Sequence, residues 1–225
     1  NLFEILKTYN TMKRLHTILF LFLASIVGLS VACTETNNDV KSFITVEDGK
    51  FIRNGEPYYF VGTNFWYGAI LGSEGEGGNR ERLTKELDFM KANGIDNLRI
   101  LVGGEGENGL LGKIEPNLQP EPGVYNDDLL AGLDYLMMEL GKRDMTAVLY
   151  FNNAWEWSGG YTQYVAWANQ TPVLVPRVDG WFSYNALAGE VVRNERAKQL
   201  FYDHLRYSIT RTNRHTGIKD IDDPA

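Results

Sequence analysis

Two polar dipeptides divide the apolar stretch that begins at residue 43 into short alternating runs. In FITVEDGKFIRNGEPYYFVGTNFW (43–66), these dipeptides are Asp48–Gly49 and Asn54–Gly55. Such pairs favour the positive φ angles that two-residue hairpin turns require. The nearly all-apolar run YYFVGTNF that follows is typical of a strand covered on both faces. The pattern therefore predicts β-hairpins leading into a buried strand.

A helix and a second strand are predicted next. Leu83, Leu87 and Met90 recur at helical spacing, with Asn79 in the position of an N-cap and Gly94 as a C-terminal stop. The apolar segment IDNLRILV that follows predicts another buried strand.

The same alternation continues to the end of the chain. The segment 126–144 predicts a helix with two aspartates near its positive end, and 145–151 (MTAVLYF) predicts a third strand. After a long aromatic loop, 194–217 predicts a third helix.

The order of hairpins followed by β-α-β-α-β-α predicts an α/β fold with parallel strands joined by right-handed crossovers. Such units occur in doubly wound sheets and in (βα)8 barrels. The loop after the first strand, GTNFWYG (62–68), has the wrong spacing and too much bulk for a dinucleotide pyrophosphate. This disfavours the nucleotide-binding option.

Composition excludes several classes of function. The chain has 225 residues, 44% apolar and 23% charged, with a net charge of −7. Nucleic acid is not an expected partner, because phosphate binding requires a basic surface and no basic cluster is present. The single cysteine permits no internal disulfide, and the three histidines are scattered. We therefore predict neither a metal site nor a cofactor.

The N-terminal region is typical of an export signal. Residues 12–33 combine a basic start, an apolar run and small residues before Cys33, which is the layout of a signal peptide. The position of Cys33 resembles a bacterial lipobox, although Ser30 replaces the usual larger apolar residue. The alternative is a free cysteine after an ordinary signal peptide.

We accordingly expect an exported protein, either a bacterial cell-surface lipoprotein or an extracellular one, whose membrane contact is a lipid anchor at Cys33. The polar residues 34–42 predict a linker. Residues 1–11 precede the plausible initiator Met12 and are interpreted as upstream or non-native sequence.

Aromatic side chains concentrate after the predicted strands. All five tryptophans lie there, mixed with Asn, Ser, Gly and Gln, and Tyr161 and Tyr164 lie nearby: Trp66, Trp155, Trp157, Trp167 and Trp181. Flat aromatic faces stack on the C–H faces of sugar rings, while amides bond the hydroxyls. A single tryptophan is as often a core residue, but the group predicts a saccharide site at the carboxyl ends of the strands.

Polar residues near the strand ends add candidates. Arg99 interrupts a predicted buried strand, so we expect it to be buried with a carboxylate partner, either in a site or in a structural ion pair. Asn152 and Asn153 close the third strand and either reach a ligand or cap a turn. The loop carboxylates are expected to be solvated: Glu105, Glu107 and Glu156.

Four segments together resemble glycoside hydrolase family 5, in its endo-β-1,4-mannanase branch. They are KFIRNGEPYYFVGTNFWYGAIL, LDFMKANG, NLRILVGGEG and VLYFNNAWEWSGGYTQYVAWA. The resemblance extends over 43–225 and implies the first three units of a (βα)8 TIM barrel. It implies β-mannan, or a related β-1,4-linked polysaccharide, as the substrate and a retaining mechanism with two glutamates.

The resemblance also implies which residues this chain supplies. The acid/base and nucleophile glutamates follow strands four and seven of the family barrel, beyond Ala225, so no catalytic glutamate is expected within this chain. Arg99 matches the arginine that orients the nucleophile. Six residues are predicted to bind substrate, together with Trp66: Asn64, Asn152, Asn153, Trp155, Tyr164 and Trp167. No role is assigned to the insertion 169–191.

Two other functions remain compatible with the sequence. A family relative that cuts cellulose or glucomannan shares the barrel and Arg99, and a glycan-binding surface lipoprotein without catalysis is compatible with the aromatic loop. On either hydrolase reading, three strands with unpaired edges predict an inactive, aggregation-prone chain.

Overall fold

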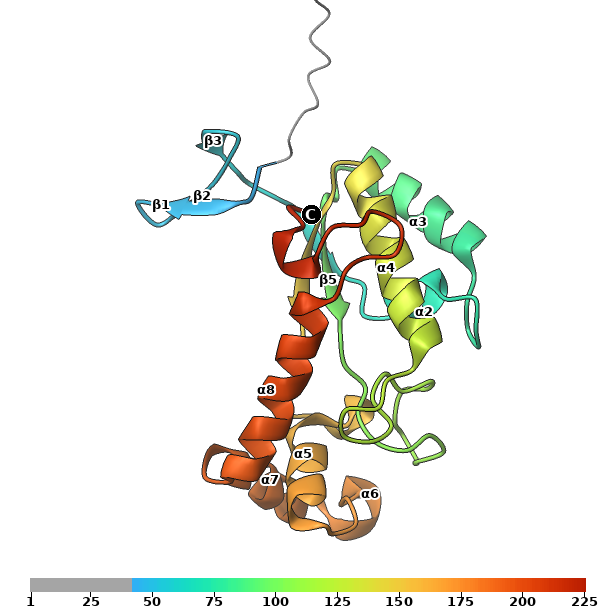
Figure 1. Ribbon diagram of the computed structural model, residues 1–225, viewed down its shortest axis with the longest axis vertical. Coiled ribbons are helices and arrows are strands. Elements are labelled where there is room, and N and C mark those ends of the chain that lie inside the picture. The colour runs from blue at the N-terminus through green and yellow to red at the C-terminus, as the bar shows by residue number, and fades with distance from the viewer. Residues whose placement is uncertain (1–41) are drawn as a thin grey trace, which may run out of the picture. The chain divides into compact units, whose positions relative to one another are not determined.

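The computed structural model describes residues 42–225, which form two three-stranded sheets with surrounding helices (Figure 1). The predictions for 1–11, for the signal peptide 12–33 and for all but the last residue of the linker 34–42 lie outside the described residues. No helix within 42–225 has both the length and the apolar character that a membrane span requires.

The first sheet confirms the predicted hairpins. Strands β1 (Thr45–Glu47), β2 (Lys50–Arg53) and β3 (Glu56–Pro57) pair antiparallel in that order. Both turns have two successive positive φ angles, 48° and 74° at Asp48–Gly49 and 54° and 79° at Asn54–Gly55. This is the geometry that the two dipeptides favour.

This sheet is attached to the amino-terminal end of the third parallel strand. Arg53 forms a 2.7 Å ion pair with Asp144, and the hydroxyl groups of Tyr58 and Thr146 are 3.0 Å apart.

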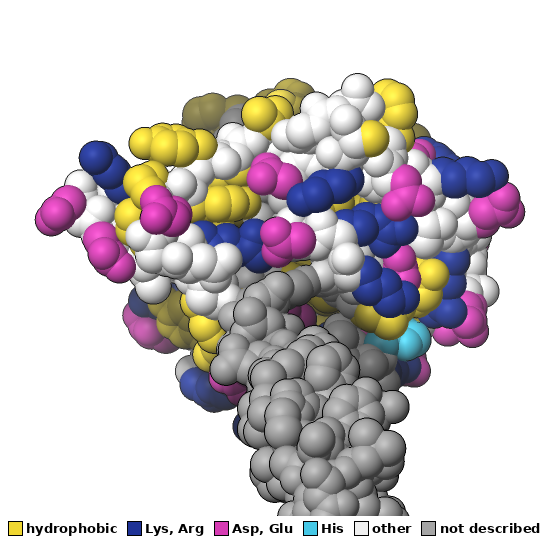
Figure 2. All heavy atoms as spheres, turned by 90° about the horizontal axis from the view of Figure 1, so that it is seen from above, with side chains coloured by type: hydrophobic (Ala, Val, Ile, Leu, Met, Phe, Trp, Pro, Cys, Tyr) yellow, Lys and Arg dark blue, Asp and Glu magenta, His cyan; other side chains and the backbone are white. Residues whose placement is uncertain are grey.

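On the face seen in Figure 2, the described acidic and basic side chains are interspersed with apolar ones. No single sign of charge dominates the described side chains on that face.

The second sheet carries the three predicted parallel strands. They are β4 (Gly62–Asn64), β5 (Asn97–Leu101) and β6 (Thr146–Tyr150), hydrogen-bonded in the order β4-β5-β6. Neighbours along the chain are thus neighbours in the sheet, and all three carboxyl ends lie at one edge.

The prediction of a first strand covered on both faces is wrong. Only three residues of the apolar run form β4, and the residues before it are exposed, with exposed fractions of 79% for Tyr59 and 62% for Val61. Within the described residues, β4 pairs on one side only, and it is an edge strand.

Helices cover one face of the parallel sheet. In Figure 1, α2 (Gly68–Gly72), α3 (Arg80–Ala92) and α4 (Asp127–Lys142) lie on the same side of the strands. The main core forms between this face and the helices. It includes the fully buried side chains Leu83, Leu87, Leu98, Ile100, Leu136 and Leu140.

The caps of these helices agree with the sequence. The side chain of Asn79 accepts a hydrogen bond from the Arg82 amide at 2.9 Å, and Gly94 has a φ angle of 79° just beyond α3. Asn126 caps α4 through the amides of Asp128 and Leu129. Each cap satisfies amide groups that the first turn of a helix leaves without partners.

The segment between β6 and the last long helix is helical where a loop was predicted. It contains α5 (Gly160–Asn169), α6 (Pro176–Asp179) and α7 (Trp181–Gly189), and α8 (Glu195–Thr210) follows. The insertion 169–191 thus folds mainly into α6, α7 and a short turn. A second core joins α5 to α8 through Tyr164, Val165, Ala197 and Leu200. Single 3-10 turns occur at Glu156–Ser158, Glu190–Val192 and Asp220–Asp222.

The residues after α8 return to the parallel sheet. Arg211 forms a 2.7 Å ion pair with Asp134 of α4, whose side chain is fully buried. The amide of Ala147 in β6 donates a 2.7 Å hydrogen bond to the carbonyl of Ala225. The end of the described chain therefore lies beside the amino-terminal half of β6.

Candidate functional site

One face of the parallel sheet is open, and Arg99 stands on it. Asn64, Arg99 and Val148 occupy the same register position on the three strands. All three side chains are exposed, while the neighbouring Leu98 and Ile100 face the helices and are fully buried.

The expected burial of Arg99 beside a carboxylate is therefore wrong. Its guanidinium donates a 3.3 Å hydrogen bond to the Asn64 side-chain oxygen and lies 3.5 Å above the ring of Tyr150. No ion pair of Arg99 is found within residues 42–225. The open face leaves the guanidinium hydrated, and a cation over an aromatic face is attracted by the ring quadrupole. The arrangement presents a cation, an amide and an aromatic ring together.

Tryptophans that follow two of the strands meet at their carboxyl ends. Trp66 follows β4 and Trp157 follows β6, and their ring centroids are 5.3 Å apart at an interplanar angle of 70°. Tyr67 packs edge-on against Trp66 at the same centroid distance. Both tryptophans are partly exposed, so aromatic surface remains available at the carboxyl ends of the strands.

A second aromatic pair involves the insertion. Trp155 is 64% exposed and packs edge-on against Trp181, with the ring centroids 6.2 Å apart. Trp181 begins α7, and Trp167 lies near the end of α5. The prediction that all five tryptophans occupy loops is therefore wrong for these two, because the region after β6 is mostly helical.

Of the predicted substrate-binding residues on α5, Tyr164 is buried and Trp167 is partly exposed. Tyr164 has no exposed surface, and Trp167 packs edge-on against its ring at 5.4 Å. Both belong to the second core, on the side of α5 that faces α8. In this structure Tyr164 supports the site without a surface that a ligand can touch.

The two asparagines after β6 differ. Asn153 is engaged locally, donating to the Ser158 hydroxyl at 2.6 Å and accepting from the Trp155 amide at 2.7 Å, which is the turn-capping alternative. Asn152 is only partly buried, yet its amide nitrogen and oxygen are enclosed without a hydrogen-bond partner among the described residues. Asn152 is thus the asparagine whose hydrogen-bonding groups remain unused.

The most strongly perturbed carboxyl is one that the sequence predicts to be solvated. Glu105 is 1% exposed, whereas Glu107 is exposed as predicted. Glu156 is half-buried, with one carboxyl oxygen enclosed. Burial raises the pKa of Glu105 to about 8, although its backbone hydrogen bonds act to lower the pKa. The group is therefore a neutral acid at pH 7. Burial likewise lowers the pKa of nearby Lys113 to about 8.

Glu105 connects the loops that follow two strands. Its carboxyl accepts from the Gly160 amide at 3.1 Å and lies 3.4 Å from the Tyr164 hydroxyl. The flanking sequence Gly103–Gly104–Glu105–Gly106 was the available signal, because clustered glycines permit close backbone contact around a side chain. Its partners on α5 lie 55 or more residues away, so their contribution was not visible from the sequence.

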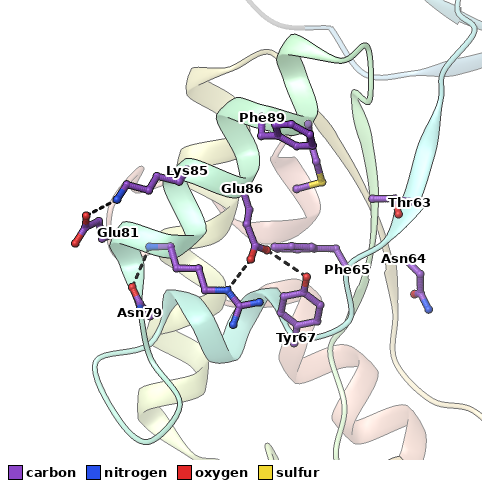
Figure 3. A pocket seen from close by; sticks show the side chains of 11 residues that line it. Thr63, Asn64, Phe65, Tyr67, Asn79, Glu81, Lys85, Glu86 and Phe89 are labelled. Carbon is purple, nitrogen blue, oxygen red and sulfur yellow. Dashed lines mark hydrogen bonds and ion pairs between the residues drawn. The ribbon is translucent and has the colours of Figure 1, made fainter.

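A separate pocket of about 570 Å³ lies between β4 and α3 (Figure 3). The Glu86 side chain lines the pocket, and its carboxylate accepts hydrogen bonds from the Tyr67 hydroxyl at 3.2 Å and from Arg82 at 2.6 Å. The pocket is on the side of β4 that faces away from β5, and neither Arg99 nor Trp157 lines it. We assign it no ligand. Among residues 42–225, no group of three or more His, Cys, Asp or Glu side chains is arranged to hold a metal ion.

The fold and the strand-end residues define a class of α/β proteins with a polar and aromatic site at the carboxyl edge of a parallel sheet. The family model described as GH family 5 beta-mannosidase-like matches residues 41–225. The chain therefore belongs to glycoside hydrolase family 5, in its β-mannosidase-like group.

Curated relatives and a solved structure agree with this assignment. Mannan endo-1,4-beta-mannosidase 1 of Solanum lycopersicum is 28% identical over 197 residues, covering 87% of this chain and 44% of the relative. Mannan endo-1,4-beta-mannosidase 7 of Arabidopsis thaliana is 27% identical over 209 residues, with 92% and 44% covered. A family 5 mannosidase from Rhizomucor miehei, solved as a mutant with mannosyl-fructose, has a TM-score of 0.77 at 34% identity, with 81% and 46% covered. The chain thus spans less than half the length of these relatives.

Proposed function

We propose that residues 43–225 are the N-terminal part of an endo-β-1,4-mannanase barrel and supply one side of its substrate cleft. The observation that carries this proposal is the meeting of Trp66 and Trp157, which follow β4 and β6, at the carboxyl ends of the parallel strands. The carboxyl ends of the strands are where (βα)8 barrels place their chemistry.

The open surfaces of the sheet are compatible with a partial barrel. The exposed face with Arg99 and Val148 corresponds to the interior of a barrel, and β4 and β6 are edge strands within 42–225. In a closed barrel further elements would pack against the outer side of β4, where the pocket of Figure 3 lies. The carbonyl of Ala225 already accepts from β6, in the position where a fourth strand would pair.

The chain's own residues would bind and orient the polysaccharide. Partly exposed indole faces offer stacking surfaces for sugar rings, and the exposed Asn64 offers an amide to hydroxyl groups. In a retaining glycosidase the two catalytic carboxyls are about 5–5.5 Å apart. The resemblance puts both glutamates on later strands, and Arg99 would orient the nucleophile from the second strand.

The test uses the full-length gene product. It is expected to release reducing ends from β-mannan faster than from carboxymethyl cellulose, and the reverse preference would assign a related β-glucanase. No release from either polysaccharide, with retained binding to mannan, would instead identify a non-catalytic glycan-binding protein. The 225-residue chain alone is expected to release no reducing ends above the blank.

The proposal for export rests on the sequence of residues 12–33. A lipid at Cys33, followed by the linker 34–42, would hold the domain at a bacterial cell surface. Expression in a bacterium fed labelled palmitate tests it, with Cys33→Ser as the matched variant. Label in the parent and none in the variant is expected; equal labelling, or none in either, contradicts lipidation.

A further inference from the structure

The β6–α5 loop (residues 151–159) carries three of the residues predicted to bind substrate, together with Trp157, but has little regular structure of its own. Its single regular element is a 3-10 turn of three residues at Glu156–Ser158. A loop that must present Trp157 to Trp66 therefore depends on outside contacts, and the strongest of these converge on Glu105.

Backbone contacts bring the Glu105 segment directly against this loop. The Glu105 amide donates to the Ser158 carbonyl at 3.1 Å, and the Ile114 amide donates to the Trp157 carbonyl. A Cβ atom on Gly159 would clash with the Glu105 backbone, and Gly159 has a φ angle of 86°. The approach is close enough that a side chain larger than hydrogen does not fit at this position.

The Glu105 side chain extends the contact to the start of α5. One carboxyl oxygen accepts from the Gly160 amide at 3.1 Å, at the helix end that favours an electron-rich partner. The Tyr161 amide then donates to the Asn153 carbonyl at 3.2 Å. The end of the loop and the first turn of α5 are thus connected to one buried side chain.

The Tyr164 hydroxyl connects Glu105 to Gln119. It donates to the Gln119 side-chain oxygen at 3.1 Å, and a Glu105 carboxyl oxygen accepts from it at 3.4 Å. The Gln119 amide nitrogen in turn donates to the Tyr125 hydroxyl at 3.4 Å.

We propose that Glu105 is a positioning residue, whose buried carboxyl fixes the β6–α5 loop so that Trp157 faces the polysaccharide. The identity of the ligand in this inference rests on the proposed function. The effect of Glu105 on the loop is independent of it. Glu105 touches no reacting group, and no carboxylate chemistry is assigned to it.

The test is amide hydrogen exchange in the 225-residue chain, compared among Glu105→Ala, Glu105→Gln and the matched control Glu107→Ala. Glu107 is exposed two residues further along the same loop. In Glu105→Ala, the amides of residues 155–161 are expected to exchange about tenfold faster, because they lose a buried hydrogen-bond partner. The exchange rates of the α4 amides are expected to be unchanged. Glu105→Gln and Glu107→Ala are expected to match the parent.

Two results would overturn the inference: unchanged exchange in Glu105→Ala, or an equal increase in α4, which would indicate general destabilisation. Should Glu105→Ala not fold, Tyr164→Phe removes the hydroxyl from the same network and is judged by the same comparison. The proposed function is tested separately on the full-length gene product, so its failure would leave the exchange result for Glu105 unchanged.

Discussion

Replacing Glu105 by Gln should change how the stability of the chain depends on pH. Glutamine has the shape of the protonated carboxyl and retains an acceptor for the Gly160 amide, but it does not titrate. The substitution therefore isolates the cost of ionising a group with 1% of its surface exposed.

The magnitude follows from the two pKa values. Burial raises the pKa of Glu105 from 4.5 to about 8 in the folded chain. Since the folded state binds this proton more tightly, its contribution to stability is complete below pH 4.5 and is lost as the pH rises through about 8. One pKa unit corresponds to about 1.4 kcal/mol. Between about pH 5 and about pH 7.5 the parent should therefore lose up to about 3 kcal/mol that the variant retains.

Other ionisable groups around Glu105 do not produce this difference. Lys113 approaches from the 103–119 loop with a pKa lowered to about 8, so it remains mostly charged over the interval. Burial raises the pKa of Tyr164 on α5 and of Tyr125 before α4, and both stay neutral. Groups elsewhere that titrate, such as Asp220 with its pKa raised to about 6, are common to both proteins.

The assay is urea unfolding followed by tryptophan fluorescence, at low protein concentration and at the two pH values. The expected result is similar free energies of unfolding at about pH 5 and a variant that is more stable at about pH 7.5. Equal slopes against pH in the two proteins would refute the reasoning, because Glu105 would then be ionised or hydrated in the folded chain.

Three further substitutions test the core, a cap and the site. Leu87→Ala, in the main core, should lower the free energy of unfolding by about 2–5 kcal/mol in urea titrations, whereas Phe89→Ala, at a side chain that is 69% exposed, should cost far less. Asn79→Ala should cost about 0.5–2 kcal/mol in the same assay, because the Arg82 amide loses its acceptor; an unchanged value would show that water replaces the cap. In the full-length protein, Arg99→Lys should lower kcat on mannan about tenfold or more, because an ammonium group does not reproduce the planar guanidinium; an unchanged kcat would remove Arg99 from the site.

Local chemistry explains the parts of the fold that could be predicted from the sequence. The Asp48–Gly49 and Asn54–Gly55 turns and the Asn79 cap depend on a few adjacent residues, and each has the predicted geometry. The order of parallel strands followed from the alternation of apolar runs and helices. These features need no knowledge of distant contacts.

The predictions that proved wrong concern features that depend on distant contacts. Exposure of Arg99 depends on which elements cover the sheet, and burial of Glu105 depends on α5, which begins 55 residues later. The helices α5 to α7 were missed because their glycines and aromatic residues have the composition of a loop. Their helical faces are defined by the second core with α8, which is a tertiary contact.

The most direct test of a substrate cleft at these strand ends measures kcat/KM of the full-length protein on β-mannan. The Trp157→Ala variant is compared with Phe182→Ala. Trp157 contacts Trp66 at the strand ends, whereas Phe182 is an aromatic residue of α7 with 89% of its surface exposed. The account predicts a loss of about tenfold or more for Trp157→Ala, equivalent to about 1.4 kcal/mol of transition-state stabilisation, and no loss for Phe182→Ala. Parental activity in Trp157→Ala would contradict a substrate cleft at the ends of these three strands.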